Sequence, residues 1–208
     1  MKKEERHLSK EEALQLHQET LVIDSKQPPA TSGFIFTERM KLDLLDMDKA
    51  GYTRSQAASQ LAKVATEEIR NSESARDQYL SLWHRSGVNV ASGTYSAGIE
   101  IERAYESATE GIAQARSYID ALQGELKLIL KAKDIEDVYK SGKHGLILDF
   151  QDTLPFGTDL SKIEYFYNLG LRVVQLTYNL RNLVGDGCTE RYKTGLTYFG
   201  QTVVQKLN

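Results

Sequence analysis

Cysteine, proline and tryptophan are scarce in this sequence, which has one, three and one of them among 208 residues. Because Cys188 is the only cysteine, no disulfide can form within the chain, and we expect a cytoplasmic location. No run of 18 apolar residues is present, and the N-terminal stretch lacks the apolar core of a signal peptide, so we expect no membrane contact. A net charge of −3 gives no electrostatic basis for binding nucleic acid.

The remaining composition is that of a globular protein, with 40% hydrophobic and 26% charged residues. Its length suffices for one domain with a sizeable core, and no internal repeat or low-complexity segment divides it. We therefore treat residues 1–208 as a single domain.

Short apolar and β-branched runs predict the strands. The predicted strands are 21–24, 88–96, 144–150 and 171–179, with a weaker candidate at 126–130 whose place could be outside the main sheet. Two prolines and a glycine end regular structure after the first run, in the stretch SKQPPATSG.

Helical spacing of apolar residues separates these strands. A short helix begins near Ser9, three helices fill the region from Thr37 to Arg85, and further helices are predicted at 99–122, 134–141, 160–169 and 198–207. Strands that alternate with helices must usually run parallel, because each crossover returns the chain to the same side. The predicted fold class is therefore α/β, and the strand count fits part of a TIM-type β/α barrel, which usually needs about 250 residues.

The C-terminal stretch LGLRVVQLTYNLRNLVGDGCTERYKTGLTYFGQTVVQKLN resembles the membrane dipeptidase (renal dipeptidase) family. In that family, a strand that ends in Leu-Thr-His or Leu-Thr-Tyr leads into an Asn-rich loop, and a helix with a GLT-x-FG motif follows. The runs LVID at 21–24 and GLILDFQDT at 145–153 match the first strand and the carboxylate-bearing strand of the family. The FQ pair resembles a bacterial branch of it.

The resemblance implies a distorted β/α barrel that holds two zinc ions and cleaves dipeptides, often with a D-residue at the C-terminal position. It also implies that 1–208 is the first half of the barrel, so that the remaining strands and metal-binding histidines would follow Asn208. We therefore expect a truncated product or a fragment. Unpaired edges of a half barrel invite pairing with another chain, so homo-oligomers are an expected form.

Carried over residue by residue, the resemblance implies that the metal ligands are replaced. Lys26 stands where the family has a ligand histidine, Pro28 where it has a ligand aspartate, and Gln151 where it has the glutamate that bridges the metals. Tyr178 takes the place of a substrate-contacting histidine in many members. An ammonium group repels cations, proline has no side-chain donor, and a carboxamide bridges two dications poorly, so we expect neither metal ligands nor a cofactor.

The candidate site follows from these positions. We expect Gln151, at the catalytic position, to converge with the substrate-binding candidates Lys26, Tyr178 and Asn179 at the C-terminal ends of the strands, where barrel enzymes collect their sites. Lys26 has the alternative of a solvated loop residue, and Tyr178 that of core packing. Asp149 and Asp152 flank Gln151, and strand alternation turns one of them inward and the other outward.

Two functions remain open on the sequence. One is a dipeptidase-like hydrolase with altered or absent metal chemistry, acting on a dipeptide-like substrate. The other is a non-catalytic barrel relative that binds a small molecule. None of the four histidines follows a strand, and Cys188 has no evident histidine partner, so neither residue type is expected to supply a metal site or a nucleophile.

Overall fold

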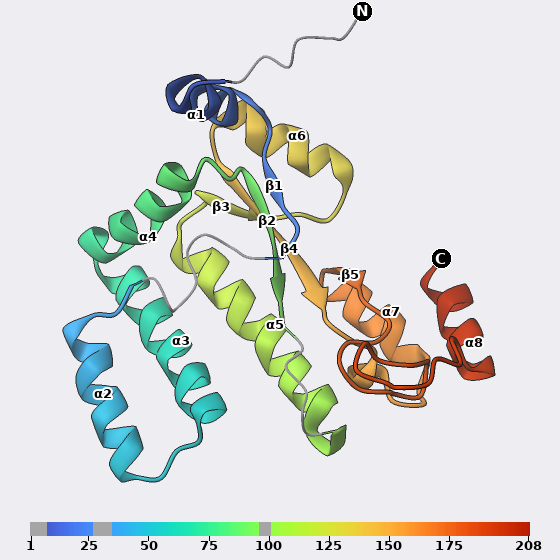
Figure 1. The fold of residues 1–208 in the computed structure, drawn as a ribbon. Helices are drawn as coiled ribbons and strands as arrows, with labels where there is room; N and C mark the ends of the chain where they lie inside the picture. The colour runs from blue at the N-terminus through green and yellow to red at the C-terminus, as the bar shows by residue number, and fades with distance from the viewer. Residues whose placement is uncertain (1–7, 27–34, 96–100) are drawn as a thin grey trace, which may run out of the picture.

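The fold is α/β, with a parallel sheet and crossover helices that form part of a TIM-type barrel (Figure 1). The computed structural model describes residues 8–26, 35–95 and 101–208. Its strands are β1 (Ile23–Asp24), β2 (Val90–Thr94), β3 (Leu126–Leu128), β4 (His144–Phe150) and β5 (Leu171–Val174). The α-helices are α1 (Lys10–Glu19), α2 (Glu38–Lys49), α3 (Arg54–Asn71), α4 (Glu73–Ser86), α5 (Ala104–Ala121), α6 (Ala132–Ser141), α7 (Ser161–Asn168) and α8 (Tyr198–Leu207).

Strand β4 is the centre of the sheet, and every pairing of the five strands is parallel. On one side it pairs with β2, which in turn pairs with β1. On its other side it pairs with β3 along its first three residues and with β5 along its last three. Because β3 ends at Leu128, the second half of that edge is free for β5, and the register of the β4–β5 pairing shifts between Leu148 and Asp149.

Side-chain caps begin several helices where the sequence predicts them. Ser9 forms a capping box with Glu12, Thr53 forms one with Gln56, and the Thr37 hydroxyl accepts a hydrogen bond from the backbone of Met40. Among the described residues, no helix has the combination of length and hydrophobicity that a membrane span requires.

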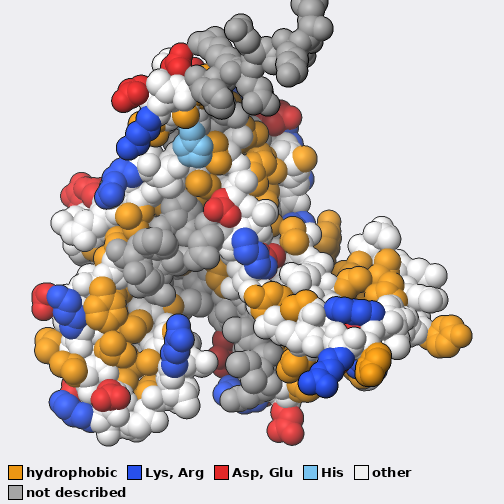
Figure 2. All heavy atoms as spheres, in the orientation of Figure 1, with side chains coloured by type: hydrophobic (Ala, Val, Ile, Leu, Met, Phe, Trp, Pro, Cys, Tyr) orange, Lys and Arg blue, Asp and Glu red, His pale blue; other side chains and the backbone are white. Residues whose placement is uncertain are grey.

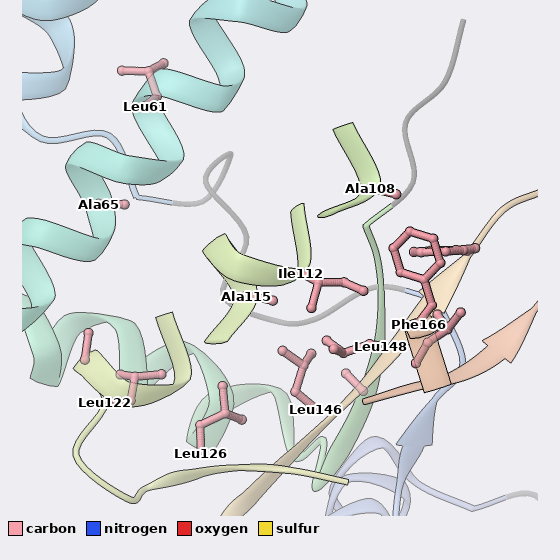
Figure 3. Packing of buried hydrophobic residues seen from close by; sticks show 14 of the residues in the cluster. Leu61, Ala65, Ala108, Ile112, Ala115, Leu122, Leu126, Leu146, Leu148 and Phe166 are labelled. Atoms are coloured by element: carbon pink, nitrogen blue, oxygen red, sulfur yellow. The ribbon is translucent and has the colours of Figure 1, made fainter. Parts of the chain in front are cut away.

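The core lies between α5 and the sheet, and it continues to α3 and α4 (Figure 3). Helix α5 turns its small residues Ala108 and Ala115 and the larger Ile112 inward, so that it packs closely over Leu146 and Leu148 of β4. At the end of the sheet, Phe150 and Phe166 pack edge to face with their ring centroids 4.9 Å apart, and Phe156 packs against both at a tilt. This packing holds the C-terminal end of β4 in place.

Several predicted elements are shorter in the structure. The strand predicted at 21–24 pairs only over Ile23–Asp24, so it begins two residues later than predicted. The strand predicted at 171–179 pairs only over Leu171–Val174, because the chain turns away from the sheet after it. The helix predicted at 99–122 begins as a 3₁₀ turn at Ile101–Arg103, and its first residues lie outside the described part, as does most of the stretch SKQPPATSG. The candidate at 126–130 belongs to the main sheet, as β3, since its apolar residues pair beside the first half of β4.

A long loop, residues 175–197, connects β5 to α8 and is fastened by one carboxylate. Asp186, whose side chain is 5% exposed, accepts hydrogen bonds from the backbone of Thr194 and Gly195, and its Oδ1 lies 2.6 Å from an Arg181 nitrogen. These donors lower the pKa of Asp186, the backbone of Thr194 contributing most. The Asp186 carboxylate thereby joins the two halves of the loop, which has no regular secondary structure.

Helix α8 begins against this loop, and Gly200 makes the contact close. An added Cβ at Gly200 would collide with the carbonyl oxygen of Val184, which is buried. We expect Gly200→Ala to lower the free energy of unfolding by about 1–3 kcal/mol, the usual cost of overpacking. Urea unfolding would measure this, with Gln201→Ala as the exposed control, expected within about 0.5 kcal/mol of wild type. Equal stability of both variants would show that α8 has room to move.

Candidate functional site

A buried aspartate with three donors lies at the C-terminal ends of β2 and β4. The Asp149 side chain is 1% exposed. Its Oδ2 accepts a hydrogen bond of 2.6 Å from the Ser92 hydroxyl, and its Oδ1 accepts one of 2.6 Å from the Thr94 hydroxyl. Both hydroxyls come from β2, where residues two apart share a face, and Thr94 is the register partner of Asp149.

The third donor is Lys26, which follows β1. Its Nζ lies 3.1 Å from Asp149 Oδ1, so that residues 123 positions apart form an ion pair. The Lys26 backbone N–H donates to the Asp24 side chain at 2.9 Å, which fixes the turn after the strand. The Lys26 side chain is 45% exposed, so the ion pair joins a partly exposed lysine to a buried carboxylate.

Tyr95 packs beside this cluster, immediately after β2. Its backbone N–H donates to the Asp149 carbonyl at 2.9 Å. An added Cβ at Gly93 would come within 2.9 Å of the Tyr95 ring, so the absence of a side chain at Gly93 leaves room for that ring. Burial above all, then Tyr118 and the Asp149 charge, raises the pKa of the Tyr95 hydroxyl, which stays protonated at neutral pH.

Gln151 and Asp152 follow β4 directly. Gln151 is half-buried, one residue past the end of the strand. Asp152 is buried and accepts a hydrogen bond of 3.0 Å from the backbone of Leu154, which shapes the turn after the strand. Burial is the largest influence on Asp152 and raises its pKa. Of the two flanking aspartates, Asp149 is therefore the one that joins Lys26.

Tyr178 and Asn179 lie in the loop after β5, both exposed. The carbonyl oxygen of Tyr178 accepts a hydrogen bond of 2.7 Å from the backbone of Cys188, and that of Asn179 accepts one of 3.0 Å from Thr189. The contacts described here bring Lys26 to Asp149, whereas those of Tyr178 and Asn179 stay within their own loop. Convergence of the four predicted residues stays a prediction.

Exposed aromatic and aliphatic side chains gather around the same loop and α8, at the right of Figure 2. Tyr192 is 84% exposed and Tyr198 90% exposed. This apolar surface lies next to the end of β5. The C-terminal side of the sheet is therefore polar at β1 and β2 and apolar beyond β5.

Ser92, Thr94 and Tyr95 are the site residues that the sequence analysis missed. Their signal was present, since a hydroxyl residue stands at alternate positions of the strand predicted at 88–96. Hydroxyls are common in strands, however, and only the pairing of this strand with β4 makes them donors to Asp149.

Comparison with known proteins matches the chain to one protein family. The sequence profile of the family described as Membrane dipeptidase (Peptidase family M19) matches residues 10–208. None of the curated proteins matches the chain.

Solved structures of similar fold include an amidohydrolase from Pseudomonas aeruginosa, with a TM-score of 0.58 and 22% identity over 93% of this chain and 45% of that one. A probable dipeptidase, PvdM, from Pseudomonas aeruginosa has a TM-score of 0.61 and 14% identity over 94% of this chain and 46% of its own. A metallo peptidase from Rhodobacter sphaeroides, liganded with a phosphinate mimic of the dipeptide L-Ala-D-Ala, has a TM-score of 0.56 and 16% identity over 68% and 52%. At these identities the likeness concerns the fold alone, and the chain spans about half the length of these structures.

Proposed function

Because the chain belongs to the membrane dipeptidase family, we propose that it binds a small, dipeptide-like carboxylate at the C-terminal ends of its strands, without the dinuclear zinc centre of the zinc members. The observation that carries this proposal is the ion pair between Lys26 and Asp149. It puts a fixed positive charge where a metalloenzyme of this fold would need an electron-pair donor.

The residues present do not fit a dinuclear zinc site. The Lys26 ammonium has no lone pair while it stays paired with Asp149, and Gln151 offers a neutral carbonyl oxygen where two dications would need a carboxylate. Both Asp149 oxygens already accept hydrogen bonds from Ser92 and Thr94. Within the described ranges, no group of three or more His, Cys, Asp or Glu side chains is arranged to hold a metal ion. Pro28 lies outside those ranges.

The same arrangement favours recognition of an anion. An ammonium group carries three donor hydrogens, and Lys26 directs one of them at Asp149. With the side chain 45% exposed, the other two can face a ligand carboxylate in a charge-assisted hydrogen bond. The buried pair with Asp149 orients the ammonium in advance, so a ligand need not order a flexible lysine. Gln151, Tyr178 and Asn179 are proposed to contact the rest of the ligand.

Peptide hydrolysis in the manner of the zinc members is the second candidate function. Family membership favours it, since the solved structures of this fold include a dipeptidase and a metallo peptidase liganded with a dipeptide mimic. The Lys26–Asp149 pair is the observation against it. We therefore rank ligand binding first and keep Gln151 as the residue at the catalytic position.

We expect Lys26→Met to weaken binding of L-Ala-D-Ala about tenfold to a hundredfold. The loss of one hydrogen bond to a charged group, about 1.5–3 kcal/mol, corresponds to that range. Isothermal titration calorimetry of the folded variant would measure it.

Lys143→Met is the matched control for charge and exposure. The Lys143 side chain is 42% exposed and pairs with Glu125, and the residue precedes β4 at the other end of the strand. Unchanged affinity in this control and a loss in the Lys26 variant would support the proposal. Equal affinity in both variants would mean that Lys26 does not bind the ligand and is a solvated loop residue.

A further inference from the structure

Two histidines meet at the end of the sheet opposite to Lys26. His84 lies in the last turn of α4, and His144 is the first residue of β4. His84 Nδ1 and His144 Nε2 are 3.4 Å apart, and the ring centroids are 4.9 Å apart with the planes at 60°. The residues are 60 positions apart in the chain, so no sequence motif marks the pair.

The backbone determines which nitrogen of His144 carries a hydrogen. His144 Nδ1 lies 3.0 Å from the carbonyl oxygen of Val88, and because a carbonyl only accepts, Nδ1 must be the donor. The lone pair of neutral His144 is then on Nε2, the atom that faces His84. A ligand histidine in metalloproteins has the same arrangement, with its second nitrogen held by a carbonyl or carboxylate.

The surroundings keep His144 neutral. The residue is 5% exposed, and the Trp83 ring centroid lies 5.0 Å from its own. Burial is the largest influence and lowers the pKa of His144; the hydrogen bond to Val88 and the Glu125 charge oppose this shift, while His84 adds to it. A neutral imidazole is the form that binds metal ions.

We propose that His84 and His144 form a two-histidine site for a divalent transition-metal ion, with Cu²⁺ as the preferred ion. Two nitrogens bound to one ion at about 2.0–2.1 Å lie about 2.8–3.0 Å apart at the right angle of a tetragonal Cu²⁺ site, and about 3.4 Å apart at a tetrahedral angle. The observed separation of 3.4 Å is therefore within about half an ångström of the tetragonal value, and a small rotation of the exposed His84 side chain closes the difference. Imidazole ligands and the general order of divalent affinities favour Cu²⁺ over Zn²⁺.

A direct hydrogen bond between the rings is the competing explanation. In a straight N–H···N bond of this length the ring centroids would be roughly 5.7 Å apart, since each nitrogen points along its own ring axis. The observed 4.9 Å shows a bent approach, which weakens that bond.

The site would be open on one side. Among the residues that the structure describes, no third His, Cys, Asp or Glu completes a group, so water would fill the other coordination positions. His84 is exposed, which gives an ion access to the buried Nε2 of His144. His17 of α1 is nearby, but its Nε2 lies 2.7 Å from the carbonyl oxygen of Ser86 and is used in that contact.

Equilibrium dialysis of untagged full-length protein against CuCl₂ would test the site, with His84→Gln and His17→Gln as matched variants. His84 is exposed, so its replacement should leave the fold intact. We expect wild type and His17→Gln to bind one Cu²⁺ more than His84→Gln. The electron paramagnetic resonance spectrum of that Cu²⁺ should show coupling to two nitrogens.

Two results would overturn the proposal. One is an equal amount of Cu²⁺ bound by wild type and His84→Gln, which would leave the pair as a hydrogen bond only. The other is a loss in His17→Gln as large as in His84→Gln, which would place the ion elsewhere. Neither result bears on carboxylate binding by Lys26, because the two sites lie at opposite ends of the strands.

Discussion

Replacing Lys26 by methionine should lower the free energy of unfolding by about 2 kcal/mol, the scale of a lost hydrogen bond to a charged group. The Asp149 side chain is 1% exposed in the wild-type protein, and the variant leaves it the Ser92 and Thr94 hydroxyls as donors. Because two neutral donors stabilise a buried charge less than two donors and a cation do, the native state loses stability. For a chain of this length we expect the midpoint of thermal unfolding to fall by about 4–8 °C.

A second change at Asp149 should remove most of this cost. Asp149→Asn alone places an amide NH₂ group, itself a donor, beside the Lys26 ammonium, which can only donate. The Ser92 and Thr94 hydroxyls can either donate or accept. In the Lys26→Met, Asp149→Asn double variant, one hydroxyl can donate to the amide oxygen and the other can accept from its nitrogen. We therefore expect the two substitutions to be non-additive, with a coupling energy of about 1–3 kcal/mol.

Urea unfolding of the four proteins measures this coupling. Lys49→Met serves as the control here, since its pair with Asp46 is exposed on both sides and should be worth less than about 1 kcal/mol. Additive effects at Lys26 and Asp149 would mean that the pair stabilises nothing and that the ammonium group merely lies near the carboxylate.

The order of strands and helices could be predicted from the sequence because the signals are local. The run HGLILDF forms β4 with the predicted bounds, and the hydroxyls of Thr37 and Thr53 cap the helices that follow them. The strand predicted at 171–179 was too long, because its length depends on pairing with a neighbouring strand. Residues 175–179 continue the apolar pattern, but the Gln175 N–H bonds to Phe150 at the last position of β4, and beyond that point β4 offers no partner.

The candidate site was predictable only in part. Lys26 and Gln151 were singled out because each follows a predicted strand at a position where the family has a metal ligand. The role of Asp149 as the acceptor of three donors depends on which strands are neighbours. Asp149 meets Ser92 and Thr94 because β2 pairs with β4, although β3 lies between them in the chain. The periodicity of the sequence predicts on which face of the sheet a residue lies, but it does not predict which strand pairs with which.

The chain should release no measurable D-alanine from L-Ala-D-Ala, and its strand ends should retain no zinc. Enzymes typically accelerate their reactions a millionfold or more, so under the proposed replacement of the metal ligands the rate should fall to the uncatalysed background. The physical reason is the charge of the site: the ammonium of Lys26 repels a dication, and the carboxamide of Gln151 does not compensate for it.

The zinc content is best measured on the His84→Gln variant, so that retained zinc reports on the strand ends and not on the histidine pair. A Lys26→His, Gln151→Glu variant of the same protein is the positive arm, because it replaces the cation by a neutral donor and the carboxamide by a carboxylate. We expect this variant to retain more zinc than its parent after dialysis.

Stoichiometric zinc in the parent, together with turnover that Gln151→Ala abolishes, would establish a metallodipeptidase and refute the role given to Lys26. Zinc in neither protein would show that the ligands required lie outside these two positions.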